Sequence, residues 1–263
     1  MREAVTLLHG FTLNGTTWKD LTSRMPGGRW TWIAPDLRGH GVAARTPCTM
    51  DDCAADLVSL WDSLDVERTH LVGYSMGGRL ALHVATRLPE RVQSLLTIGA
   101  HAGLDGDARA ARRQADEALA AKIEANGIEP FVNYWSAQPM FAGLERRGST
   151  FNARLRAVRL ANVPAGLACS LRGMGAGAMT PLWDGLPNIR VPCTFVAGED
   201  DGAYVTAARR LAAAVPGARV ELIAGAGHAA QMERPAAFAR VLADHLARGA
   251  VDAGSSASSL TSA

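Results

Sequence analysis

The chain has 263 residues, enough for one core domain of ordinary size with an insertion. Hydrophobic residues make up 48% of it and charged residues 20%, a balance typical of soluble globular proteins. The formal net charge of +2 excludes a strong overall field of either sign, so we expect neither nucleic acid nor an acidic surface as a partner.

Targeting and metal signals are missing from the sequence. No apolar run reaches the ~18 residues that a membrane helix needs. The first ten residues, MREAVTLLHG, lack the long apolar stretch and the small-residue cleavage site of a secretory signal. We therefore expect a cytoplasmic protein without membrane insertion. The four cysteines show no CxxC pairing and no metal-ligand spacing, so we expect reduced, buried thiols.

Short apolar runs alternate with longer amphipathic segments, the pattern of a parallel sheet covered by helices. The expected strands, in chain order, are residues 4–8, 31–34, 70–72, 94–98, 193–197 and 220–223. The expected helices are residues 51–64, 76–87, 205–215 and 235–246.

One long segment interrupts this alternation. Residues 105–172 contain helix-like patterns and no convincing strand, so we expect them to form a helical cap over the carboxyl ends of the strands. Ligands of open α/β sheets bind at those ends. The core is then formed by residues 1–104 and 173–250. The Ser-rich stretch 251–263 has no periodicity and is expected to be a disordered tail.

The strongest local signal is GYSMG at residues 73–77, between an expected strand and an expected helix. A G-x-S-x-G turn in that setting needs small residues, because it is strained and tightly packed, and it exposes the serine at a helix N-terminus. This nucleophile elbow makes Ser75 the candidate catalytic serine. The backbone N–H of Met76 is one expected donor of an oxyanion hole. The N–H of Phe11, in the loop after the first strand, is the other.

The base and the acid follow from chain order, which in this arrangement is serine, acid, histidine. His228 stands in a small-residue loop directly after the last expected strand, which makes it the candidate base. His245 lies in the final helix and is expected on the surface. The acid should follow the preceding strand, where Glu199, Asp200 and Asp201 are adjacent. We favour Asp201, with Asp200 as the alternative, to orient the imidazole and stabilise its charged form.

These pieces resemble α/β hydrolases, and two segments give a narrower resemblance. Residues 170–177 read SLRGMGAG, with PLW at 181–183, and residues 135–141 read WSAQPMF. They resemble the S-L-R-G-M-G-T-G and W-x-x-x-P-x-F segments of 2-succinyl-6-hydroxy-2,4-cyclohexadiene-1-carboxylate synthases, the pyruvate-eliminating enzymes of menaquinone biosynthesis. The likeness extends from the first expected strand to Pro235. One departure follows the candidate base, where the family's H-x-x-H-x-E pattern reads HAAQME and Gln231 replaces the second histidine.

The resemblance implies an α/β-hydrolase fold with a mostly parallel sheet and a helical cap. The first expected strand starts almost at once, whereas hydrolases of this fold usually have two antiparallel strands before it. We therefore expect the sheet to be shortened at its N-terminal edge.

The resemblance also implies a small polycarboxylate substrate and no metal or organic cofactor. A planar guanidinium binds a carboxylate with two hydrogen bonds, which suits arginines to such a substrate. The substrate-binding residues carried over from the family are Tyr74, Arg79, Arg112 (four residues before Asp116), Trp135 and Arg159. The simpler interpretation of the three arginines is that they lie on solvated helix faces. This interpretation fits Arg79 least, because the positive end of a helix dipole disfavours a cation in the first turn.

By the same resemblance, His228 activates Ser75, whose alkoxide removes a proton from the substrate. Charge then spreads onto a carbonyl held by the N–H groups of Phe11 and Met76, and pyruvate leaves as its enolate. The first alternative is an esterase, thioesterase or C–C bond hydrolase that uses Ser75 as a covalent nucleophile. A second is a ligand receptor without turnover. The sequence leaves the oligomeric state open.

Overall fold

The computed structural model describes residues 3–41 and 46–257 of the chain. Its strands form one six-stranded sheet in the order β2-β1-β3-β4-β5-β6, and every described pairing is parallel. All six expected strands are confirmed, with small shifts at their ends. The strands are β1 (Glu3–Leu8), β2 (Trp30–Ile33), β3 (Thr69–Tyr74), β4 (Val92–Ile98), β5 (Cys193–Gly198) and β6 (Arg219–Ile223).

The strand order brings the two most informative loops together. The chain passes from β2 across β1 to β3, so the loop after β1 and the turn after β3 emerge side by side at the carboxyl edge of the sheet. In an open α/β sheet this is where ligands bind. Strand β2 forms the outer edge, and no antiparallel strand flanks it among the described residues, as expected for a sheet shortened there.

Helices cover both faces of the sheet. The helices of the core are α1 (Lys19–Thr22), α2 (Met50–Ser63), α3 (Met76–Arg87), α8 (Gly202–Ala214), α9 (Ala230–Glu233) and α10 (Pro235–Ala257), with short 3-10 turns η1 (Gly15–Trp18), η2 (Pro89–Arg91) and η4 (Trp183–Asn188). Successive strand residues point to opposite faces. Thus Leu71 packs in the cluster under α2, α3 and α8, while Val72 packs in the cluster under α1 and α10.

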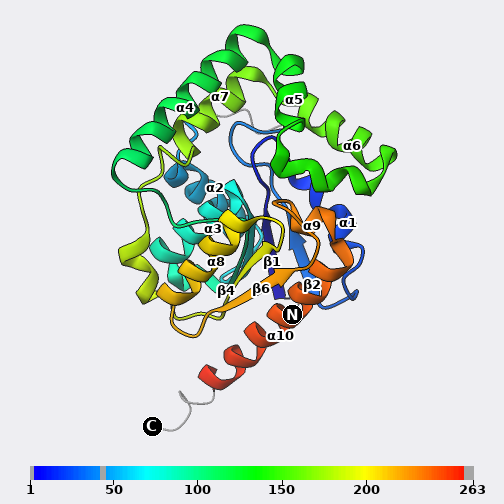
Figure 1. The fold of residues 1–263 in the computed structure, drawn as a ribbon. Helices are drawn as coiled ribbons and strands as arrows, with labels where there is room; N and C mark the ends of the chain where they lie inside the picture. The colour runs from blue at the N-terminus through cyan, green and yellow to red at the C-terminus, as the bar shows by residue number, and fades with distance from the viewer. Residues whose placement is uncertain (1–2, 42–45, 258–263) are drawn as a thin grey trace.

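The segment from 105 to 172 is helical, and no strand occurs in it. Figure 1 shows its helices gathered over one end of the sheet. A small apolar cluster, including Ile123, Phe131 and Leu167, packs these helices against one another. The elements are α4 (Gly106–Asn126), α5 (Ile128–Ser136), η3 (Pro139–Arg147), α6 (Ser149–Leu160) and α7 (Pro164–Met174).

The final helix differs from the expectation in two respects. Helix α10 continues to Ala257, past residue 250, while residues 258–263 of the expected tail lie outside the described residues. The expectation of a surface position for His245 was wrong, because its side chain is fully buried. Its ring nitrogens bond to Thr194 on β5 and Ser94 on β4, each at 2.9 Å. In the part of the chain that the structure describes, no helix is both long enough and apolar enough to cross a membrane.

Candidate active site

The turn between β3 and α3 has the strained geometry of a nucleophile elbow. Ser75 has φ 51° and ψ −107°, a conformation that non-glycine residues rarely adopt. The flanking glycines are sterically required. A Cβ on Gly73 would lie 2.3 Å from the carbonyl oxygen of Gly77, and one on Gly77 would lie 2.3 Å from that of Leu8. This close packing fixes the serine at the N-terminus of α3, where the helix dipole favours negative charge.

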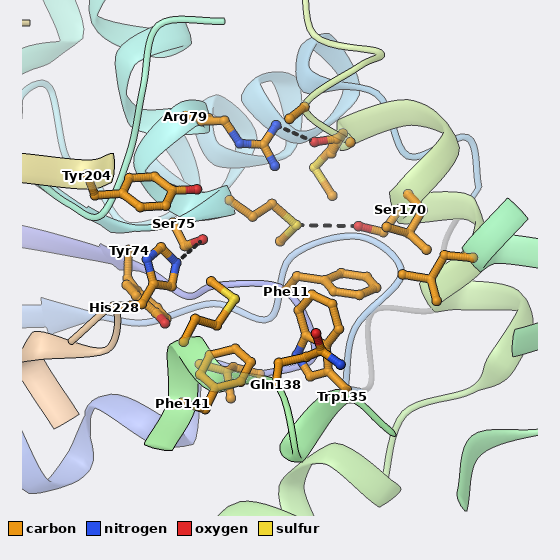
Figure 2. Close-up of a pocket in the computed structure, with 18 of the residues that line it drawn as sticks. Phe11, Tyr74, Ser75, Arg79, Trp135, Gln138, Phe141, Ser170, Tyr204 and His228 are labelled. Carbon is orange, nitrogen blue, oxygen red and sulfur yellow. Dashed lines mark hydrogen bonds between the residues drawn. The ribbon is translucent and has the colours of Figure 1, made fainter. Parts of the chain in front are cut away.

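A continuous hydrogen-bonded chain joins the three residues that the sequence singled out, and Figure 2 shows its Ser75–His228 part. His228 Nδ1 lies 2.9 Å from Asp201 Oδ2, and Nε2 lies 3.0 Å from Ser75 Oγ. A carboxylate can only accept, so Nδ1 donates to it and Nε2 is left to accept the serine proton. This is the tautomer that a general base needs. The carboxylate that contacts the imidazole belongs to Asp201, whereas Asp200 is exposed.

The loop after β1 lies on the other side of Ser75. Phe11 and Met76, the two expected oxyanion donors, both line the cavity next to the serine. His9 acts in the framework of this loop: its Nε2 accepts the N–H of Leu37 at 2.9 Å, and its Nδ1 donates to the carbonyl of Gly10. Burial lowers the pKa of His9 to about 4, so it is neutral and suited to that acceptor role.

A cavity of about 240 Å³ opens between Ser75 and the cap helices. Figure 2 shows Arg79 and Tyr204 on one side of it, and Gln138, Trp135 and Phe141 on the other. The lining includes Ser75, His228 and all five expected substrate-binding residues, namely Tyr74, Arg79, Arg112, Trp135 and Arg159.

Two of the three arginines are buried and form no salt bridge among the described residues. Arg79 donates to the carbonyl of Met174 at 2.6 Å, and burial lowers its pKa to about 10. Arg159 donates to Ser136 Oγ at 2.7 Å and lies over the ring of Phe141, and burial lowers its pKa as well. Neither has a carboxylate partner among the described residues. A buried cation is costly unless it is paired, so the cavity is built to receive anions.

Arg112 behaves differently from the other two. Its Nε bonds to Asp116 Oδ1 at 2.8 Å, and nearly half of its side chain is exposed. Asp116 is buried and also accepts the N–H of Gly177, which ties α4 to the segment after α7. Arg112 and Asp116, which the resemblance gave only as matching positions, are thus joined by a salt bridge in the structure. Arg112 also lines the cavity.

Tyr204, Phe141 and His101 are among the cavity residues that were not predicted from the sequence. Tyr204 packs on the imidazole of His228 with ring centroids 4.4 Å apart, and Phe141 lies 6.4 Å from it. His101 also lines the cavity, and burial followed by repulsion from Arg79 lowers its pKa to about 4. A signal existed for Tyr204, because a residue three positions after Asp201 lies in the first turn of α8 beside that acid.

Comparisons with known proteins match this chain to proteins of one family. A family model described as the alpha/beta hydrolase family matches residues 7–241. A protein of Bacillus subtilis (strain 168), provisionally named 2-succinyl-6-hydroxy-2,4-cyclohexadiene-1-carboxylate synthase, is 35% identical over 252 residues, which cover 93% of this chain and 90% of that protein. The synthase of that name from Klebsiella pneumoniae subsp. pneumoniae is 33% identical, with 91% of this chain and 92% of that protein covered.

Two solved structures are similar in fold. The structure of MenH from S. aureus superposes with a TM-score of 0.88 and 29% identity, covering 94% of each chain. The enol-lactonase from Burkholderia xenovorans LB400 has a TM-score of 0.82 and 24% identity over 94% of this chain and 92% of its own. The second likeness concerns the fold alone.

Proposed function

The chain belongs to the alpha/beta hydrolase family and, within it, to the 2-succinyl-6-hydroxy-2,4-cyclohexadiene-1-carboxylate synthases, and on that premise we propose that it is a lyase of menaquinone biosynthesis. It eliminates pyruvate from the succinyl-enolpyruvyl-hydroxycyclohexene carboxylate intermediate. The observation that carries this proposal is one cavity in which the Ser75–His228 pair faces two buried arginines without carboxylate partners among the described residues. A small polycarboxylate supplies the missing charges. We also propose that the enzyme acts in the cytoplasm.

In the proposed reaction Ser75 is a base and forms no bond to the substrate. His228 takes the hydroxyl proton, and Asp201 stabilises the resulting imidazolium. The serine alkoxide removes a ring proton, and its electrons move into the conjugated system while the C–O bond to the enolpyruvyl group breaks. Pyruvate leaves as its enolate and is then protonated. General-base removal and oxyanion stabilisation by Phe11 and Met76 each supply roughly 10²–10³-fold of the rate.

The arginines orient the substrate in this scheme. Arg79 and Arg159 line the cavity from α3 and α6 (Figure 2 shows Arg79). Two separated carboxylates on one ligand would satisfy both cations, and Arg112 stands at the cap side for a third. Tyr74 and Trp135 provide flat apolar surface for a conjugated ring. No step calls on a metal or an organic cofactor.

The alternative is a hydrolase in which Ser75 attacks an ester, thioester or activated C–C bond. The 3.0 Å contact between Ser75 Oγ and His228 Nε2 favours it to the same degree, because that geometry also activates a nucleophile. The arginine pair distinguishes the two, since a neutral ester leaves both cations unpaired.

The test is a direct assay of the purified chain with the pathway intermediate, in which pyruvate release is coupled to lactate dehydrogenase. We expect saturable turnover that disappears in Ser75→Ala and in His228→Gln. Absence of pyruvate release from a folded wild-type protein would reject the lyase assignment.

A further inference from the structure

Apart from His228 itself, the loop that bears His228 has only small side chains that cannot form hydrogen bonds. Residues 224–227 read AGAG, and Ala229 follows the histidine. Glycines give such a sequence high backbone freedom. The Ser75–His228 contact needs a fixed imidazole, because a misplacement of about 1 Å can cost ~10²-fold in rate. Something outside the loop must therefore fix its backbone.

Glu233, on α9, makes the contacts that do so. Its Oε2 accepts the N–H of Gly227 at 2.9 Å, and its Oε1 accepts the N–H of Ala229 at 3.1 Å. These are the two residues that flank His228 in the chain. Only 1% of the Glu233 side chain is exposed, so both bonds form away from water. Charge-assisted bonds of this kind are about twice as strong as neutral ones.

The same carboxylate is seated against the cap. A Cβ on Gly143, in η3, would lie 1.7 Å from Glu233 Oε2, so a larger residue there would force the carboxylate to move. Arg146 NH2 lies 3.7 Å from Oε2 and donates to the carbonyl of Gly225 at 3.0 Å. Arg147 donates to the carbonyl of Met232 and to Asp20 at 2.8 Å. The segment η3 is thereby fastened to both sides of the His228 loop.

We infer that Glu233 is a positioning residue, which fixes the backbone on both sides of His228 and joins that loop to η3 through Gly143 and Arg146. This inference rests on the proposed roles of Ser75 and His228. Since η3 also contributes Met140 and Phe141 to the cavity, the wall of the substrate site and the base share one anchor.

Two variants disturb the anchor by different routes. Glu233→Gln keeps the shape but offers an NH2 group where one backbone N–H must be accepted. Gly143→Ala removes no polar group from the protein and displaces the carboxylate of Glu233 by steric contact. We expect each to lower kcat by about 10- to 100-fold with KM nearly unchanged, since substrate contacts remain. Gly27→Ala is the matched control, because nothing lies within 4 Å of a Cβ there.

A double-variant cycle separates positioning from general damage. In a Glu233→Ala background the steric conflict at Gly143 no longer exists, so adding Gly143→Ala should cost almost nothing further. Residues in contact deviate from additivity in this way, whereas distant ones add. Additive losses, or lost melting temperature with normal kcat in the folded fraction, would overturn the inference and leave Glu233 a stabilising residue only.

The decisive measurement needs no substrate, and therefore stands apart from the lyase assignment. The proton between His228 Nδ1 and Asp201 gives a far-downfield line in the ¹H NMR spectrum, assigned by its loss in His228→Gln. We expect a sharp line in the wild type and in Gly27→Ala, and a line broadened by water exchange or absent in Glu233→Gln and Gly143→Ala. An unchanged line in both anchor variants would overturn the inference.

Discussion

The sheet has two hydrogen-bonded chains of serine, histidine and carboxylate, one at each end of its strands. At the carboxyl end, Ser75, His228 and Asp201 are joined at 3.0 and 2.9 Å. At the amino end, Ser94 Oγ lies 2.7 Å from His70 Nδ1, and His70 Nε2 lies 2.9 Å from Glu3 Oε2. The distances are so similar that the hydrogen-bonding pattern alone does not show which of the two groups is catalytic.

Their surroundings differ completely. Ser94 and His70 are fully buried, and Ser94 also accepts from His245, which in turn contacts Thr194. Arg248 donates to Thr194 at 2.8 Å, and Glu3 can only accept, so these charged ends fix the direction of every proton between them. The hydroxyls and ring nitrogens of this network all have hydrogen-bond partners within the protein. Ser75 instead stands on a strained elbow and lines a cavity. An active site thus requires access and unsatisfied polar groups as well as the right three side chains.

Removing each serine gives the largest expected contrast. Ser75→Ala should lower kcat for pyruvate release by several orders of magnitude, because the base is lost, while its free energy of unfolding changes by less than about 1 kcal/mol. Ser94→Ala should do the reverse. It leaves ring nitrogens of His70 and His245 without partners, at about 1–3 kcal/mol each, and kcat stays normal. Urea denaturation and steady-state kinetics on both variants measure this. Near-normal turnover in Ser75→Ala would remove it from the mechanism.

Asp201, the acid at the carboxyl end of the strands, gives the next largest effect. Asp201→Asn should reduce kcat by up to ~10⁴-fold, because an amide favours the wrong imidazole tautomer. Asp200→Asn is the matched control, since Asp200 is exposed and next in sequence, and it should be nearly silent. Comparison of kcat for the two variants decides the assignment. The reverse ranking would move the role to Asp200.

The arginines come third, because each makes one contact among several. Replacing Arg79, Arg112 or Arg159 by Ala should lower kcat/KM by about 10- to 100-fold per site, which corresponds to a charge-assisted contact of ~1.5–3 kcal/mol. Lysine should restore only part of this, because it lacks the planar fork. Titration with a polycarboxylate product analogue measures the same loss as a weaker Kd. Wild-type affinity in all three Ala variants would exclude them from the substrate site.

Acid provides the most graded test, and it acts on the buried histidines at the amino end of the strands. Burial lowers the pKa of His245 to about 3, and burial also lowers that of His70. An unfolded histidine titrates near 6.5, so below that pH the unfolded state binds more protons. The free energy of unfolding should therefore fall as pH drops from about 6.5 towards 3, by at most ~1.4 kcal/mol per pH unit for each histidine.

The variant His245→Gln checks this assignment. Urea midpoints measured between about pH 6 and pH 4 should fall less steeply than in the wild type, because one titrating group is gone. An identical slope would mean that His245 takes no part in the acid sensitivity. His9, whose pKa is also lowered by burial, continues to titrate in both proteins.

Sequence reasoning reached local features and stopped at long-range ones. The strands could be predicted because each is a short buried run, and Ser75, Asp201 and His228 because elbow chemistry and chain order constrain them. His245 was misplaced, although it lies three residues after the buried Leu242, because its partners come from β4 and β5. The contact of Glu233 with Gly143 joins segments far apart in the chain, and no local pattern indicates it.

The central claim is that Ser75 acts as a proton-abstracting base in elimination. It is tested most directly by measuring, on one preparation, kcat/KM for pyruvate release from the pathway intermediate and for hydrolysis of short-chain nitrophenyl esters. We predict efficient pyruvate release and slow ester turnover, because small neutral esters leave Arg79 and Arg159 unpaired. Ester kcat/KM of ~10⁴ M⁻¹s⁻¹ or more, within the ordinary enzymatic range, together with no detectable pyruvate, would contradict the account.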